Sequence, residues 1–130
     1  MVILISKQTH RLPTVKGYFM IKVVIAFKRR QGMSIEEFRN YRRDVHAPML
    51  FAIPEAKKIR RFVISYPTDY ASSEVPRFDA MVEAWFDNTE EMDKLFLSDN
   101  FATKVDPDHV NFIDLTSVVR LVVEELIVVE

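Results

Sequence analysis

The sequence predicts an α+β protein built on a four-stranded antiparallel sheet. β-Branched apolar runs alternate with amphipathic segments in the order strand, helix, strand, strand, helix, strand. The chain has 130 residues, enough for one domain with a single core, and its 48% apolar content is typical of a globular protein. This element order is the split βαβ, or ferredoxin-like, arrangement. It implies that the four strands lie in the order 4-1-3-2 across the sheet.

Two parts of the chain differ in composition. Residues 1–19 carry three basic side chains and no acidic one, and the apolar run 2–5 is too short for a secretory signal. We expect an N-terminal extension over 1–19 and the folded domain over 20–130. A short extra strand at 2–5 is the alternative.

The strands follow from β-branched composition and a period of two. The clearest alternation places Ala80, Val82 and Ala84 on one face and Glu83 and Trp85 on the other. The last strand is long, and we expect a bend at residues 124–125, beyond which the run L-I-V-V reaches a second subunit. The predicted strands are residues 21–28, 58–66, 78–86 and 117–130, with a loop over 67–77.

The first helix is predicted over residues 34–48. It begins with a capping box, in which Ser34 and Glu37 each satisfy a backbone N–H of the first turn. An apolar stripe at helical spacing faces the core and consists of Phe38, Tyr41, Val45 and Met49. Pro48 predicts that the helix ends or kinks, leaving His46 at the border of the core beside free carbonyls that favour a charged imidazole.

The second helix is predicted to start at Asn88 or Thr89, to be interrupted near Ser98 and to continue to about Val105. A polar turn over 106–115 follows, with two apolar residues tucked inward.

Composition excludes several classes of protein. There is no cysteine, which removes disulfides and thiolate chemistry and agrees with a cytoplasmic location. Two glycines cannot form a Gly-rich phosphate loop, and no apolar run is long enough to span a bilayer. We therefore expect no nucleotide cofactor and no membrane segment.

Charge is divided unevenly along the chain. Residues 1–61 hold 14 Lys or Arg against 4 Asp or Glu, whereas residues 62–130 hold 4 against 15. A basic half can bind nucleic acid. In the predicted sheet, however, basic and acidic strands are neighbours, which favours pairing within the fold over nucleic-acid binding.

Helices on only one face of the sheet leave the other face bare. An apolar face of that size needs a partner. We expect a symmetric homodimer that packs its sheets face to face into a barrel and also uses the C-terminal strand.

Several stretches closely resemble the EthD family: M-I-K-V-V-I-A-F-K-R-R-Q-G-M-S-I-E-E-F, Y-R-R-D-V-H-A-P, F-D-A-M-V-E-A-W-F-D and N-F-I-D-L. The resemblance covers about residues 20–126. It implies a dimeric α/β barrel and similarity to methylmuconolactone isomerases, quinone-forming monooxygenases and enzymes acting on polyketide anthrones. Methylmuconolactone isomerases have a histidine at the position of His46 but a cysteine where this chain has Ala84.

The candidate catalytic residue is His46, either as a general acid/base or as a histidine that caps the helix end. Candidate substrate-binding residues are Tyr41, Glu83, Trp85, Phe112 and Asp114. Each has a structural alternative. The aromatic residues can be core, Glu83 can pair with Lys22 or Arg120, and Asp114 can hold the loop or His46. The cluster Asp106, Asp108 and His109 is interpreted as solvated capping, so no metal site is predicted.

The sequence thus favours a cofactor-independent isomerase, lyase or cyclase that acts on a small aromatic, lactone or polyketide-like substrate. The alternatives are a non-catalytic dimer that binds a small ligand, a cofactor-free monooxygenase, and, from another class, a nucleic-acid-binding protein.

Overall fold

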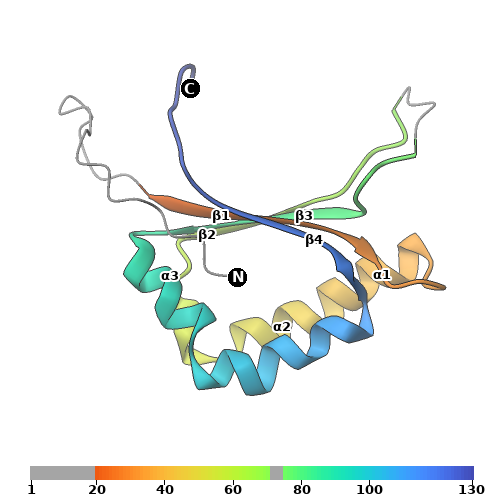
Figure 1. Cartoon of the computed structure of the whole chain (residues 1–130), viewed down its shortest axis with the longest axis horizontal. Coiled ribbons are helices and arrows are strands. Elements are labelled where there is room, and N and C mark those ends of the chain that lie inside the picture. Colours follow the sequence, from red (N-terminus) through yellow and green to blue (C-terminus); the bar gives the residue numbers. More distant parts are fainter. Residues whose placement is uncertain (1–19, 71–74) are drawn as a thin grey trace.

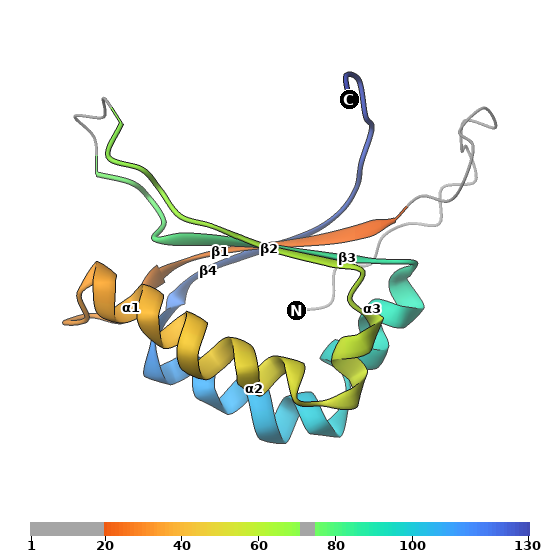
Figure 2. The same ribbon diagram turned by 180° about the vertical axis from the view of Figure 1, so that it is seen from behind.

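The computed structural model describes residues 20–70 and 75–130. One four-stranded antiparallel sheet is covered on a single face by the helical segments (Figures 1 and 2). The strands lie in the order β2-β3-β1-β4, which confirms the predicted ferredoxin-like topology. They are β1 (Ile21–Arg29), β2 (Arg61–Ser65), β3 (Ala80–Phe86) and β4 (Ile113–Glu124). The expectations for residues 1–19 lie outside the described residues.

Strand register gives the sheet two different faces. Val23 pairs with Ala84 and Val122, and these side chains point toward the helices. Val24 pairs with Glu83 and Leu121 on the opposite face, which we call the outer face. The predicted alternation of β3 is confirmed, because Ala80, Val82, Ala84 and Phe86 are buried against the helical layer.

The first helical segment is a continuous rod that passes Pro48, so the predicted end of the helix at that residue is wrong. It comprises α1 (Ile35–Tyr41), a π-helical turn (Arg42–His46) and α2 (Ala47–Phe51), and the predicted Ser34–Glu37 capping box starts it. Within the π turn the Ala47 N–H bonds to the Arg42 carbonyl, five residues back. The proline, which has no N–H, therefore follows a point where the α-helical ladder is already interrupted.

The π turn also changes which side chains face the core. Val45, predicted to face inward, is 39% exposed, whereas Arg42 and His46 are 4% and 2% exposed. The wider π turn rotates less per residue, so residues four apart stay on one side. The buried stripe is consequently Phe38, Arg42, His46 and Leu50.

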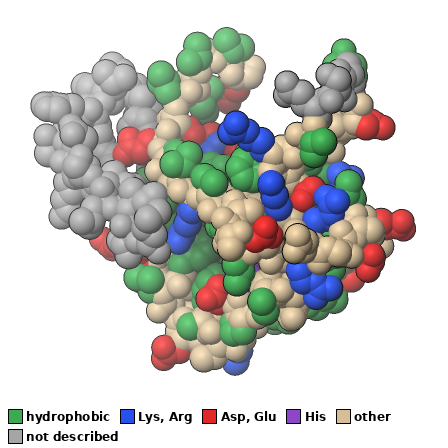
Figure 3. Space-filling model, turned by 45° about the vertical axis from the view of Figure 1, so that its right-hand side comes forward, with side chains coloured by type: hydrophobic (Ala, Val, Ile, Leu, Met, Phe, Trp, Pro, Cys, Tyr) green, Lys and Arg blue, Asp and Glu red, His purple; other side chains and the backbone are tan. Residues whose placement is uncertain are grey.

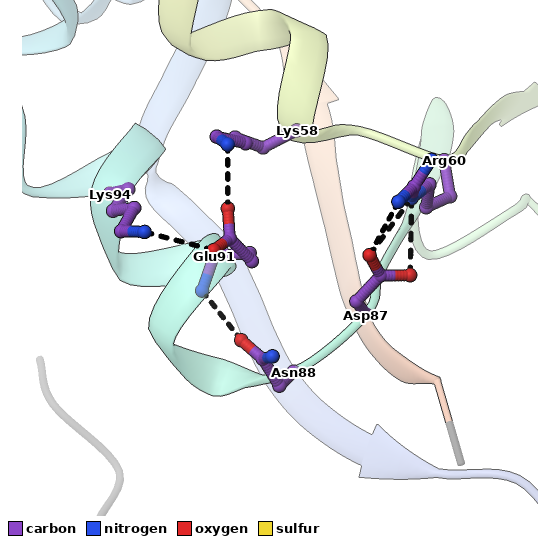
Figure 4. Close-up of polar contacts among 6 residues, drawn as sticks. All are labelled: Lys58, Arg60, Asp87, Asn88, Glu91 and Lys94. Atoms are coloured by element: carbon purple, nitrogen blue, oxygen red, sulfur yellow. Dashed lines mark hydrogen bonds and ion pairs between the residues drawn. The ribbon is translucent and has the colours of Figure 1, made fainter. Parts of the chain in front are cut away.

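The second helical segment contains α3 (Thr89–Phe96), a π turn (Phe101–Val105) and a 3₁₀ helix (Asp106–Asn111). The polar turn predicted over 106–115 is therefore helical at its start and strand at its end. Asn88 caps α3 by accepting from the Glu91 N–H, and Glu91 pairs with Lys58 and Lys94 (Figure 4). These contacts attach the start of α3 to the 3₁₀ helix Pro54–Lys58.

Ion pairs join the basic first half of the chain to the acidic second half, as predicted. Lys22 pairs with Glu83 at 2.8 Å, Arg29 with Asp79 at 2.7 Å and Arg60 with Asp87 at 2.6 Å. These three pairs offset part of the opposite charge of the two halves, in the sheet and at the strand ends.

Beyond β4 the chain leaves the sheet and projects away from the helices (Figure 1). The four residues Leu126 to Val129 are 70% exposed or more. Hydrophobic side chains accordingly occupy the projection at the upper centre of Figure 3. The strand thus ends at Glu124, the position of the predicted bend.

Candidate active site around His46 and Asp108

The central feature is a buried hydrogen bond between two helical segments. His46, on the π turn, places Nδ1 at 2.9 Å from Oδ2 of Asp108, on the 3₁₀ helix. Their side chains are only 3% and 7% exposed. Packing of the two segments on the same face of the sheet brings these residues together.

Asp108 accepts three hydrogen bonds. The Tyr41 hydroxyl donates to Oδ1 at 2.5 Å and the Asn111 amide donates to the same oxygen at 3.0 Å, while His46 Nδ1 lies at Oδ2. Donors of this kind stabilise the ionised carboxyl, and the pKa of Asp108 is lowered although burial acts in the opposite direction. Asp108 is therefore an anion at neutral pH.

The carboxylate fixes the imidazole tautomer. An ionised Asp108 can only accept, so Nδ1 of His46 carries the proton and Nε2 carries the lone pair. Burial, with smaller effects from His109 and Arg42, lowers the pKa of His46 to about 4. The histidine is therefore neutral at pH 7. The charged form was expected beside free carbonyls at a helix end, but the helix continues past His46.

Aromatic rings hold the imidazole in place. The rings of Phe112 and His109 lie 4.7 and 4.6 Å from that of His46, measured between centroids. The Tyr41 ring lies 5.3 Å from Phe112, and the pKa of its phenol is raised by the hydrogen bond to Asp108 and by burial. Tyr41 thus stays protonated and donates to the carboxylate at neutral pH.

His46 lines a cavity of about 460 Å³ between the helices and the sheet. Most of its wall is apolar and comes from all four strands, including Ile25, Phe62 and Val82. Its volume is in the range of small-molecule sites. The polar groups that line it are Arg42, His46, Asp106, His109 and Arg120.

The structure divides the substrate-binding residues proposed from the sequence. Phe112 packs against the His46 ring, and Tyr41 packs on Phe112 and donates to Asp108. Trp85 and Glu83 are on the outer face, across the sheet from His46. Asp114 accepts from the hydroxyl and N–H of Thr116, so it bonds within the start of β4 and makes no hydrogen bond to His46.

The outer-face residues form their own cluster. The Trp85 ring lies between Lys22 and Arg61, whose charged groups are 5.2 and 4.8 Å from its centroid, and its indole N–H donates to Glu125. Glu83 pairs with Lys22, which was one of its two predicted partners. The hydrogen bond to Glu83 also raises the pKa of Lys22.

Two residues of the site were missed from the sequence. Asp108 was interpreted as solvated, and the D-P-D-H stretch gives no local sign of its burial. Arg42 was not singled out, because the α-helical period places it beside the inward stripe and only the π turn brings it in. Within the described residues, no group of three His, Asp or Glu side chains is arranged to hold a metal ion.

Comparison with protein families gives a match to most of the chain. A family model, the EthD domain, matches residues 30–116, which include both His46 and Asp108. A search of curated proteins finds no match. Among the described residues no helix has the length and apolar character needed to cross a bilayer.

Solved structures share the fold. An EthD-family protein from Bacillus halodurans is 19% identical with a TM-score of 0.64, the alignment covering 82% of this chain and 99% of that one. An EthD-like protein from Ralstonia eutropha is 22% identical with a TM-score of 0.61, covering 88% and 96%. A dimeric ferredoxin-like protein of unknown function from Bacteroides fragilis is 14% identical with a TM-score of 0.59, covering 83% and 100%. Since the family model spans more than half of the sequence, this chain belongs to the EthD domain family.

Proposed function

We propose that this protein is a cofactor-independent enzyme that moves a proton on a small aromatic, lactone or polyketide-like substrate. The reaction would be an isomerisation, an elimination or a cyclisation. The observation that carries the proposal is the Asp108–His46 pair at the cavity, with the Nε2 lone pair of a neutral imidazole left to act as the base.

The chemistry follows from the two residues. Nε2 of His46 takes a proton from an enolisable carbon or a phenol of the substrate, and the imidazolium that forms is stabilised by the negative charge of Asp108. The same nitrogen can return the proton at another position, which completes an isomerisation. Tyr41 and Asn111 keep Asp108 ionised and oriented throughout.

Polar lining favours catalysis over simple ligand binding. A site that only binds an apolar ligand needs few polar groups, enough to fix the orientation of that ligand. Here two imidazoles and two guanidinium groups line the cavity. Such groups are costly to bury, and a reaction gives them a role.

The test is deuterium incorporation in D₂O into a panel of enolisable lactones, anthrones and phenolic ketones, followed by NMR. The wild-type protein should exchange at least one substrate far above background, and His46→Gln should lose that exchange. Arg43→Gln is the matched control, since Arg43 is 70% exposed and pairs with its neighbour Asp44. Exchange by His46→Gln at the wild-type rate would refute His46 as the base.

The protein is further proposed to act as a cytoplasmic homodimer, paired through the outer face and the C-terminal segment. Met81, Val119 and Leu121 on the outer face are 37%, 48% and 53% exposed, and the apolar residues 126–129 project beside it. The described parts of the β2–β3 connection, residues 66–70 and 75–79, project on the same side of the sheet, so the outer face lies between these parts and the C-terminal segment (Figure 2). The Bacteroides fragilis protein of the same fold is described as dimeric, which supports this assembly.

A further inference from the structure

Arg42 is a buried cation whose guanidinium has no hydrogen-bond or ion-pair partner in the described part of the chain. The residue is 4% exposed, and its Nε atom is buried without a hydrogen bond. Burial lowers the pKa of Arg42 to about 10, so the group is still charged at neutral pH. A guanidinium has five N–H donors, and burying it without an acceptor is costly.

The surroundings of Arg42 are aromatic. The guanidinium carbon lies 5.4 Å from the ring centre of Phe27 and 5.7 Å from that of Phe112. These rings accommodate the flat face of the group. They do not accept the in-plane hydrogen bonds that its edge can donate.

Within residues 20–70 and 75–130, no neighbouring carboxylate is available to neutralise Arg42. Asp108 is already engaged by Tyr41, Asn111 and His46. Among the described cavity-lining residues, Asp106 is the single carboxylate, and it is 64% exposed and paired with His109. The cavity also receives Arg120 from β4, whose Nε is likewise buried without a hydrogen bond. Positive charge therefore dominates the polar lining.

Arg42 and His46 stand four residues apart on the same side of the rod, and both line the cavity. A ligand that is hydrogen-bonded to the edge of the Arg42 guanidinium would thus lie beside His46. We propose that the substrate is a small organic acid, and that its carboxylate binds Arg42 while His46 acts on a neighbouring part of the same molecule. This inference rests on the proposed function for the identity of the base, and adds the chemical class of the substrate.

A bound carboxylate would also improve the base. The charged or titratable groups that act on His46 are Asp108, His109 and Arg42, and the positive charge of Arg42 contributes to the low pKa of the imidazole. An anion beside Arg42 offsets that charge, so the pKa of His46 should rise toward neutrality when the ligand binds. A base is most effective when its pKa is near the working pH.

Calorimetry with a defined set of probes tests the inference without any turnover. Benzoate, salicylate and 2-naphthoate are compared with the neutral amides of the same acids, which have nearly the same shape. Wild-type protein should bind at least one carboxylate saturably and at least tenfold more tightly than its amide. Arg42→Gln should lose this preference, Arg42→Lys should retain part of it, and Arg43→Gln should behave as wild type.

Equal binding of acid and amide, or no saturable binding of any carboxylate, would overturn the inference. If circular dichroism shows that the Arg42 variants do not fold, the comparison of acid with amide in the wild-type protein still tests whether the cavity prefers a carboxylate. A second measurement is the pKa of His46 by NMR, which should rise when the carboxylate is bound. Carboxylate selectivity that persists in His46→Gln would separate this inference from the catalytic role of His46.

Discussion

Nδ1 of His46 lies 2.9 Å from a carboxylate oxygen of Asp108, a residue 62 positions further along the chain. The two residues lie on different helical segments, so their contact depends on tertiary packing. The contact exists because a π turn and a 3₁₀ helix pack side by side beneath the sheet. Burial keeps the imidazole neutral, and the contact with Asp108 gives it a defined tautomer.

The first prediction concerns stability as a function of pH. The pKa of His46 is about 4 in the folded protein and has a reference value of 6.5. Above pH 6.5 His46 is unprotonated in both the folded and the unfolded protein, and its contribution to the free energy of unfolding is fully present. As the pH falls from 6.5 to about 4, the unfolded chain binds the proton first, so the folded state loses stability.

The free energy of unfolding should fall by about 3 kcal/mol between pH 6.5 and about 4. Urea unfolding at pH 7 and at pH 4.5 measures it, with His46→Gln as the comparison. The variant should show a flatter dependence in this range, because ordinary carboxylates titrate mainly below it. Parallel curves for the two proteins would show that His46 does not carry the effect.

The second prediction concerns Asp108→Asn. The amide has no negative charge to stabilise the imidazolium, so the pKa of His46 should fall further and the proton-transfer rate should drop by about 10²-fold. Ligand affinity should change little, because Arg42 is untouched. Asp99→Asn, which changes an exposed aspartate, is the control for loss of one negative charge. A variant that keeps the wild-type rate would remove Asp108 from the mechanism.

The third prediction concerns the outer face. Leu121→Glu places a carboxylate in the middle of the proposed dimer interface, where burying an unpaired charge is costly. Sedimentation velocity should show a dimer for the wild-type protein and a monomer for the variant. Val110→Glu, on the 3₁₀ helix at a site that is 57% exposed, should remain dimeric. A monomeric wild-type protein, or a dimeric Leu121→Glu, contradicts the proposed interface.

Much of the fold could be predicted because its signals are local. The period of two over β3 and the capping box at Ser34 depend on neighbours within a few residues, and both are confirmed. The strand order followed from the order of elements. The resemblance to the EthD family pointed to the same topology.

The site was harder to predict because tertiary packing decides it. A regular α-helical period places Val45 in the core, whereas the π turn places Arg42 and His46 there. Asp108 stands in a polar stretch that is typical of a surface turn, and only its packing against the first helical rod buries it. The sequence pattern allowed Trp85 to line the pocket or pack elsewhere, and strand register puts it on the outer face.

The proposed chemistry requires that His46 is a neutral base held by Asp108. Two-dimensional ¹⁵N–¹H NMR of the imidazole, recorded from pH 7.5 to pH 3.5 without ligand, measures tautomer and pKa together. At pH 7 we predict a protonated Nδ1 and an unprotonated Nε2, with a titration midpoint at about pH 4. A proton on Nε2 at pH 7, or a midpoint at or above the ordinary value of 6.5, would contradict a neutral His46 that is protonated on Nδ1 and held by Asp108.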